Sequence, residues 1–179
     1  LVIKIWEIKY LLDGTDESVT VATTRPETLL GDMALAVNPE DERFAHLIGK
    51  NAIIPICKRL IPIVGDGYVD PEFGTGVVKI TPGHDFNDYE LGKRHGLFMD
   101  ESMQCHIGDE KEFNPISILN KAVQIEGVAP EKYHGMDRFE ARKELLEDLK
   151  QDNCLVSQDE YESTLPYGDR SDQILEPLL

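Results

Sequence analysis

Paired cysteines, basic residues and long apolar runs are all scarce in this chain. Its three cysteines, Cys57, Cys105 and Cys154, lie far apart without a C-x-x-C pair, which argues against a zinc ribbon and a disulfide framework. No apolar run exceeds a few residues and no leader peptide is recognisable, so we expect no membrane contact. No Asn-x-Ser/Thr site occurs either, and together these absences predict the cytoplasm or an organellar matrix.

The deficit of basic residues limits how the chain can bind nucleic acid. Only 18 residues are Lys or Arg against 34 Asp or Glu, which gives a formal net charge of -16. Phosphate backbones are bound mainly by Lys and Arg, which release counterions. If RNA is a partner, we therefore expect this chain to hold only a small part of it.

The remaining composition predicts one folded domain over residues 1–179. Hydrophobic residues make up 41% and charged residues 29%, as in ordinary globular proteins. Strand-like runs alternate with a few helical ones, which predicts a mixed α/β domain with a curled β-sheet or β-barrel core and peripheral helices. The strands are expected over 1–12, 18–24, 34–37, 52–57, 60–64, 75–81, 116–119, 122–125 and 155–156. The helices are expected over 26–31, 38–49 and 84–95 and from 137 onward, with a loop or hairpin over 97–114. Both ends look extended, which is typical of a domain inserted into another one.

The first segment that suits chemistry is Ala22-Thr-Thr-Arg-Pro-Glu-Thr28, where a β-branched strand runs into a helix start. Its hydroxyls and its guanidinium, beside exposed backbone amides, suit a phosphate, a ribose or a carbonyl oxygen. The alternative is a plain strand-to-helix turn in which the threonines act as caps.

The second segment runs from Gly74 to Glu90. Lys79 and Thr81 fall on one face of a predicted strand, and Asp85 and Asp88 fall three apart on a predicted helix. A lysine, a hydroxyl and two carboxylates are thus expected to converge at a strand-to-helix junction. The alternative is structural, because Asp is a common N-cap and acidic residues favour a first helical turn.

Other catalytic motifs are missing. The chain has no G-x-x-x-x-G-K, G-x-S-x-G or H-E-x-x-H motif and no complete dinucleotide fingerprint. His84, Asp85 and Asp88 have the residue types of a metal site, but three ligands from one turn without a fourth make a weak one. We therefore expect no metal and no cofactor.

Together, the two segments resemble the editing domain (connective peptide 1) of class I aminoacyl-tRNA synthetases for branched aliphatic amino acids. The similarity rests on Thr23-Thr-Arg-Pro-Glu-Thr28, Phe73-Gly-Thr-Gly76, Lys79-Ile-Thr-Pro82, His84-Asp85, 137–142 and 166–171, in that order. It is closest to the valyl branch, because leucyl enzymes typically have Asp at position 27, and isoleucyl enzymes have Trp there and no arginine at 25. Gly83 stands where alanine is more usual in the family.

The resemblance implies a proofreading deacylase that hydrolyses mischarged threonyl-tRNA(Val), with threonyl-adenylate as a second candidate substrate. On this hypothesis Lys79, Asp85 and Asp88 are the catalytic residues: Asp88 binds the substrate's α-ammonium group, while Lys79 and Asp85 recognise the threonine hydroxyl. Thr81 and His84 are expected to surround the side chain and ester, and Thr23, Thr24, Arg25 and Thr28 to hold the terminal adenosine. The implied partners are the single-stranded acceptor end of tRNA and the remainder of a parent synthetase, and the isolated domain is expected to be a monomer.

Three alternatives stay open at this point. The chain could be the editing domain of the isoleucyl or leucyl enzyme. It could be a module that binds the acceptor end of tRNA without hydrolysing the ester. The third alternative is a metal hydrolase that uses His84, Asp85 and Asp88.

Overall fold

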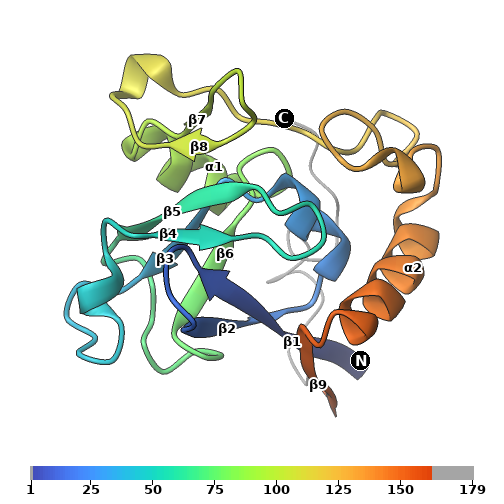
Figure 1. The fold of residues 1–179 in the computed structure, drawn as a ribbon, viewed down its shortest axis with the longest axis horizontal. Coiled ribbons are helices and arrows are strands. Elements are labelled where there is room, and N and C mark those ends of the chain that lie inside the picture. The colour runs from blue at the N-terminus through green and yellow to red at the C-terminus, as the bar shows by residue number, and fades with distance from the viewer. Residues whose placement is uncertain (1, 163–179) are drawn as a thin grey trace.

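The computed structural model of this protein describes residues 2–162, which form two sheets and a few helices (Figure 1). The large sheet contains β1 (Val2–Leu12), β2 (Ser18–Thr23), β3 (Ala34–Val37), β4 (Asn51–Ile53), β5 (Leu60–Gly65), β6 (Val77–Ile80) and β9 (Leu155–Glu162). The small one is a hairpin of β7 (Phe98–Met99) and β8 (Cys105–His106). The α-helices are α1 (Phe86–Arg94) and α2 (Arg138–Gln151), and the 3-10 helices are η1 (Pro26–Gly31), η2 (Ala45–Leu47), η3 (Glu110–Glu112) and η4 (Glu131–Tyr133).

The large sheet is mixed and curls until its edges nearly meet. Its order is β2-β1-β4-β5-β3-β6, with β9 added to β1, and of its recorded pairs only β3 with β5 is parallel. The hydroxyl of Thr75, just before β6, donates to the backbone oxygen of Thr20 in β2, 2.5 Å away. This contact joins the two edges, and the helices lie outside the sheet (Figure 1). The predicted fold class, a curled mixed sheet with peripheral helices, is confirmed.

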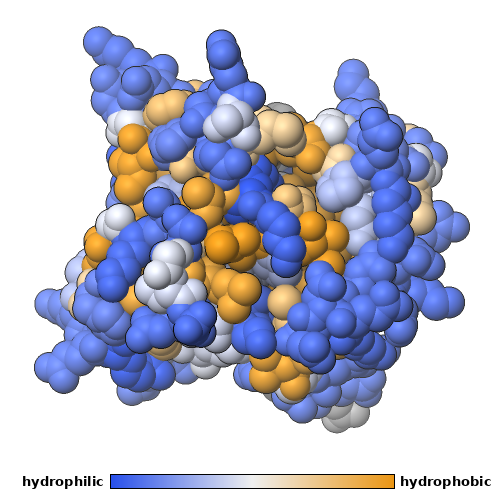
Figure 2. All heavy atoms as spheres, viewed as in Figure 1, coloured by the Kyte–Doolittle hydropathy of each residue, from blue (hydrophilic) through white to orange (hydrophobic). Residues whose placement is uncertain are grey.

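The core follows from how the strands alternate. In β1, every second side chain is buried, from Trp6 through Ile8 and Tyr10 to Leu12. In β3, all four residues are buried, because this strand lies between β5 and β6 and is covered on both faces. Figure 2 shows hydrophobic residues gathered in the middle of one face, with hydrophilic residues around them.

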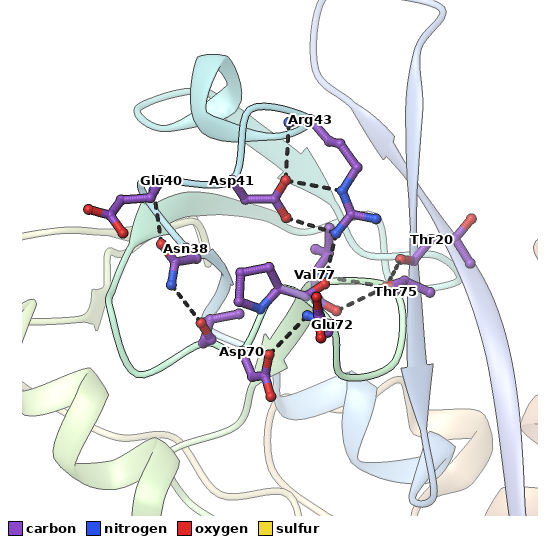
Figure 3. A network of polar contacts seen from close by, with 11 residues as sticks. Thr20, Asn38, Glu40, Asp41, Arg43, Asp70, Glu72, Thr75 and Val77 are labelled. Carbon is purple, nitrogen blue, oxygen red and sulfur yellow. Dashed lines mark hydrogen bonds and ion pairs between the residues drawn. The ribbon is translucent and has the colours of Figure 1, made fainter.

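The predicted helix over 38–49 is wrong except for the short η2. Side chains take the backbone amides that a helix would use: Asn38 accepts from the amide of Glu40, and Asp41 accepts from that of Arg43. The Arg43 guanidinium in turn donates to Asp41 and to the oxygen of Pro71 (Figure 3). This network ties the loop after β3 to the loop that leads into β6.

Two predicted strand regions are also corrected. β4 ends at Ile53, because the chain turns and Ile56 and Lys58 adopt positive φ angles. Residues 116–125 form no regular strand: a turn at 121–122 is flanked by isolated bridges of Leu119 with Ile125 and of Gln124 with Asp137. The hairpin within 97–114 is confirmed. The expected tail beyond 162, including 166–171, lies outside the described residues.

Helix α2 begins directly after Asp137, as predicted, and packs beside η1. Asp137 accepts from the amides of Phe139 and Glu140, and Glu140 completes the capping box. Leu145 and Leu149 are buried, whereas Phe139 is 58% exposed and does not belong to the apolar face.

A bidentate ion pair joins α2 to the threonine-rich segment. The guanidinium of Arg142 binds both carboxylate oxygens of the fully buried Glu27, at 2.7 and 2.8 Å, and lies over the ring of Trp6. Glu27 therefore faces α2 and supports the segment from behind.

We predict that Arg142→Met lowers the free energy of unfolding by about 3 kcal/mol, because it removes the bidentate partner of the buried Glu27 carboxylate. Lys150→Met is the matched control on the same helix. It removes a surface pair with Glu147 and should change stability by less than about 0.5 kcal/mol. Urea unfolding of the three proteins measures both values, and equal losses would contradict the role given to the Glu27 pair.

Candidate functional site

The antiparallel pairing of β3 with β6 brings the two predicted segments together. Ala34 lies opposite Ile80, and the amide of Met33 donates to the oxygen of Ile80 at 2.9 Å. The residues just before β3 therefore lie beside those that end β6. The end of η1, which carries the threonine-rich segment, thus meets the junction between β6 and α1.

Lys79 is the centre of this junction. As the strand period predicts, its side chain shares a face with that of Thr81, and its ammonium donates to the Thr81 hydroxyl at 2.7 Å. The same nitrogen donates to the hydroxyl of Thr28 at 2.8 Å and lies 2.9 Å from a carboxylate oxygen of Asp32. An ammonium has three hydrogens, so each already has an acceptor within the protein. Lys79 is 8% exposed, and Thr28 and Thr81 are nearly buried.

The two carboxylates lie at the start of α1, as expected. Asp85 is the N-cap and accepts from the amide of Asp88, while Asp88 accepts from the amide of Thr81 at 2.9 Å. Burial, reinforced by the negative charge of Asp85, raises the pKa of Asp88 to about 7. Asp88 is therefore a carboxyl group that changes charge near neutral pH.

His84 links the β6–α1 turn to residues 116–118. It is fully buried, and its Nε2 accepts from the amide of Ile118 at 3.0 Å. Burial and then the charge of Lys79 lower its pKa to about 4, so the ring is neutral. Gly83 has no room for a side chain, because a Cβ there would lie 2.1 Å from the oxygen of Ile116.

Arg25 joins the two segments directly, since its guanidinium donates to the backbone oxygen of His84 at 2.8 Å. Thr23 accepts from the amide of Arg25, so it shapes the turn, and Thr24 is exposed. The structure thus brings Arg25, Thr28, Lys79 and Thr81 into one contact network with the start of α1. The roles predicted for these residues in binding and catalysis stay predictions.

Three residues that contact this network were missed by the sequence analysis. Asp32 is fully buried between Lys79 and the hydroxyl of Tyr10, and Arg59 donates to the backbone oxygens of Leu30 and Asp32. Burial raises the pKa of Asp32, and the neighbouring ammonium opposes that shift. The available signal for Asp32 was a charged residue directly before the apolar run 33–37. Nothing local marked Tyr10, because its contact depends on the curl of the sheet.

The described part of the chain offers no group of three or more His, Cys, Asp or Glu side chains placed to hold a metal ion. The three cysteines are free thiols. Among residues 2–162, the longest helices also fall short of what crossing a bilayer requires.

Comparison with known proteins shows that this fold is the editing domain of a class I aminoacyl-tRNA synthetase. Residues 40–150 match the family model described as leucyl-tRNA synthetase, editing domain, and the chain belongs to that family. It is 49% identical over 175 residues to a valine--tRNA ligase of Legionella pneumophila (strain Lens) and 48% identical over 179 residues to one of Neisseria meningitidis serogroup B. These alignments cover 98% of the chain but only 17% and 18% of the two relatives.

Solved structures show the same fold. The crystal structure of GlLeuRS-CP1 matches with a TM-score of 0.63 at 14% identity, covering 90% of this chain and 100% of that one. A LeuRS of Agrobacterium radiobacter K84, in a ternary complex with tRNA and LeuAMS, matches with a TM-score of 0.62 at 18% identity. That match covers 89% of this chain and 20% of the LeuRS chain.

The raised pKa of Asp88 predicts how stability depends on pH. The unfolded chain loses this proton near pH 4, an ordinary value for Asp, whereas the folded chain holds it to about pH 7. The contribution of Asp88 to the free energy of unfolding therefore falls as pH rises from about 4 to about 7. Asp88→Asn lacks this titration and should gain stability relative to the parent across that window, then keep a constant advantage above it.

Urea unfolding at four pH values between 4.5 and 8 measures the difference between parent and variant. The asparagine keeps an oxygen that can accept from the Thr81 amide, so the pH dependence reports the charge. A difference that stays constant over the window would show that the folded state does not raise the pKa.

Proposed function

We propose that this chain is the proofreading domain of a valyl-tRNA synthetase and hydrolyses threonyl-tRNA(Val). One observation carries the proposal: a buried ammonium, two threonine hydroxyls and a carboxyl that titrates near neutral pH meet at the junction of β6 and α1. Because the chain spans about a sixth of its valine--tRNA ligase relatives, a parent synthetase of the same specificity belongs to the proposal.

The chemical need for such a site follows from the similar shapes of valine and threonine. A hydrophobic synthetic pocket, with the valyl enzyme itself as the established example, rejects threonine only about a hundredfold. A second site must recognise the hydroxyl that the first one tolerates. Valine would leave the polar groups of that site unpaired, at a cost of about 1–3 kcal/mol for each buried group.

The contacts suggest how the groups divide the work. Ionised Asp88 binds the α-ammonium group of the misattached amino acid. Thr28 and Thr81 face the side chain, and Lys79 supplies positive charge behind them; it contacts the substrate directly only by exchanging one of its three acceptors. Asp85, which is partly exposed beside them, is the other group placed to meet the threonine hydroxyl.

The rest of the assignment concerns the tRNA and water. Arg25, held against the β6–α1 turn, and Thr24, exposed beside it, are placed for the terminal adenosine or its phosphate. Water is the nucleophile, oriented in the site by hydrogen-bond donors near the developing oxyanion. Thr23 and His84 act by shaping the two turns, since their contacts are with backbone amides.

The experiment is deacylation of threonyl-, valyl- and isoleucyl-tRNA by the chain, with and without EDTA. The parent should release threonine preferentially, and chelator should have no effect. Asp88→Ala should reduce threonine release by about a hundredfold or more, because it removes the group that orients the substrate. For the parent, KM for threonyl-tRNA should fall as pH rises through about 7, when Asp88 ionises.

Each alternative has its own outcome in this assay. Loss of activity in EDTA identifies a metal hydrolase, and preference for another aminoacyl-tRNA identifies another branch of the family. Binding without release of any amino acid identifies a docking module. Full activity of Asp88→Ala would remove Asp88 from the site. A circular dichroism spectrum like that of the parent is the control for folding.

A further inference from the structure

A buried ion pair lies directly behind the proposed site. Asp32 sits in the short link between η1 and β3 and is fully buried. Its Oδ1 lies 2.9 Å from the ammonium of Lys79 and accepts from the hydroxyl of Thr81 at 2.8 Å. Its Oδ2 accepts from the hydroxyl of Tyr10, which comes from β1 on another part of the sheet. Asp32 therefore contacts the site residues without itself reaching solvent.

These bonds fix the direction of every hydrogen in the cluster. Lys79 donates to Asp32, Thr28 and Thr81, so the ammonium has one orientation. The Thr81 hydroxyl donates its single hydrogen to Asp32, and the Thr28 hydroxyl donates its hydrogen to the backbone oxygen of Arg25. Each threonine oxygen then has one lone pair left, because a hydroxyl has one hydrogen and two lone pairs.

A group that meets these two oxygens must therefore be a hydrogen-bond donor. The hydroxyl of a threonyl group can donate, whereas the corresponding methyl of valine cannot. A neutral side chain at position 32 would hold the Thr81 hydroxyl by a weaker hydrogen bond, so this hydroxyl could turn and present its hydrogen. Lys79 would at the same time lose its contact with the charged acceptor of this network.

We propose that Asp32 is a positioning residue for substrate discrimination: it orients the Lys79 ammonium and the Thr81 hydroxyl so that Thr28 and Thr81 present only acceptor lone pairs to the substrate. The inference rests on the proposed hydrolysis of threonyl-tRNA. Tyr10 assists by holding the second carboxylate oxygen in place. Asp32 acts through its neighbours and has no contact with the substrate.

The test compares Asp32→Asn with a control that breaks an ion pair elsewhere. Asp41 is also buried and pairs with Arg43 in the loop network of Figure 3, away from the β6–α1 junction. Asp32→Asn should lower kcat for threonyl-tRNA by about tenfold to a hundredfold and lower the ratio of threonyl to valyl hydrolysis. Asp41→Asn should change both by less than about twofold, as distant sites act independently.

A double-mutant cycle separates positioning from a general effect on the fold. If Asp32 acts through Lys79, then adding Asp32→Asn to Lys79→Met should cost less than about twofold beyond Lys79→Met alone. Fully multiplicative losses would overturn the inference. Tyr10→Phe removes one hydrogen-bond donor to Asp32 without changing a charge. It should lower kcat for threonyl-tRNA and the ratio of threonyl to valyl hydrolysis by a smaller factor than Asp32→Asn does. This variant keeps the test decisive if Asp32→Asn folds poorly.

The NMR signal of the Lys79 side chain gives a readout that does not depend on activity. At one fixed pH, the side-chain ¹⁵N signal of Lys79 should move in Asp32→Asn, because the ammonium has lost its charged acceptor, and it should stay in place in Asp41→Asn. Other ionisable groups around it are shared by both proteins; they are Tyr10 on β1, Arg59 before β5, His84 in the β6–α1 turn, and Asp85 and Asp88 at the start of α1.

The outcomes distinguish this inference from the proposed function. If the parent hydrolyses threonyl-tRNA and Asp32→Asn behaves like Asp41→Asn, only the positioning role is wrong. If the parent does not hydrolyse it, the proposed function is wrong, and the ¹⁵N signal of Lys79 still decides whether Asp32 holds the ammonium. Identical Lys79 signals in the parent and in Asp32→Asn would overturn the positioning role.

Discussion

The hydrogen-bonded pairing of β3 with β6 is the constraint on which the candidate site depends. These strands are neighbours in the sheet although about forty residues separate them along the chain. Their register sets Ala34 opposite Ile80, and this brings Asp32, two residues before Ala34, into contact with Thr81 and Lys79. A slip of one residue would turn Lys79 to the opposite face, because strand side chains alternate.

The buried ion pair between Lys79 and Asp32 lowers the stability of the fold unless other contacts compensate it. Removing an ammonium and a carboxylate from water costs free energy that their attraction offsets only when the remaining hydrogen-bonding groups are satisfied. Here Tyr10, Thr28 and Thr81 provide those bonds, so the pair is compatible with a stable core. An apolar pair of similar volume would serve stability equally well, which favours a functional reason for the charges. For the pair of Glu27 and Arg142 a functional reason is less strongly favoured. Arg142 is partly exposed, and its contacts already explain why α2 packs where it does.

Much of the site was predictable because short-range sequence patterns determine where several of its residues lie. The two-residue spacing of Lys79 and Thr81 placed them on one face, and Asp85 is an ordinary N-cap signal. The contact between Thr28 and Lys79 depends on strand pairing, and spacing alone could only suggest it. Asp32 and Tyr10 were missed for the same reason. The wrong helix over 38–49 has a different cause, since Asn38 and Asp41 bind backbone amides in turns that compete with a helix.

On the proposed function, the acidity of the chain fits a site that selects its substrate while the rest of the parent synthetase supplies most of the tRNA affinity. Lys79 is the cation at the centre of the cluster, and Asp32 already compensates its charge, so little net positive charge remains there for phosphate. Binding to an RNA backbone scales with the number of phosphates neutralised, and a chain of net charge -16 neutralises few. Discrimination as proposed needs only a few well-placed hydrogen-bond acceptors, and the threonine hydroxyls are the candidates for them. Because the chain matches only 17% of the Legionella pneumophila ligase, the same proposal assigns binding of the tRNA body to the rest of a parent synthetase.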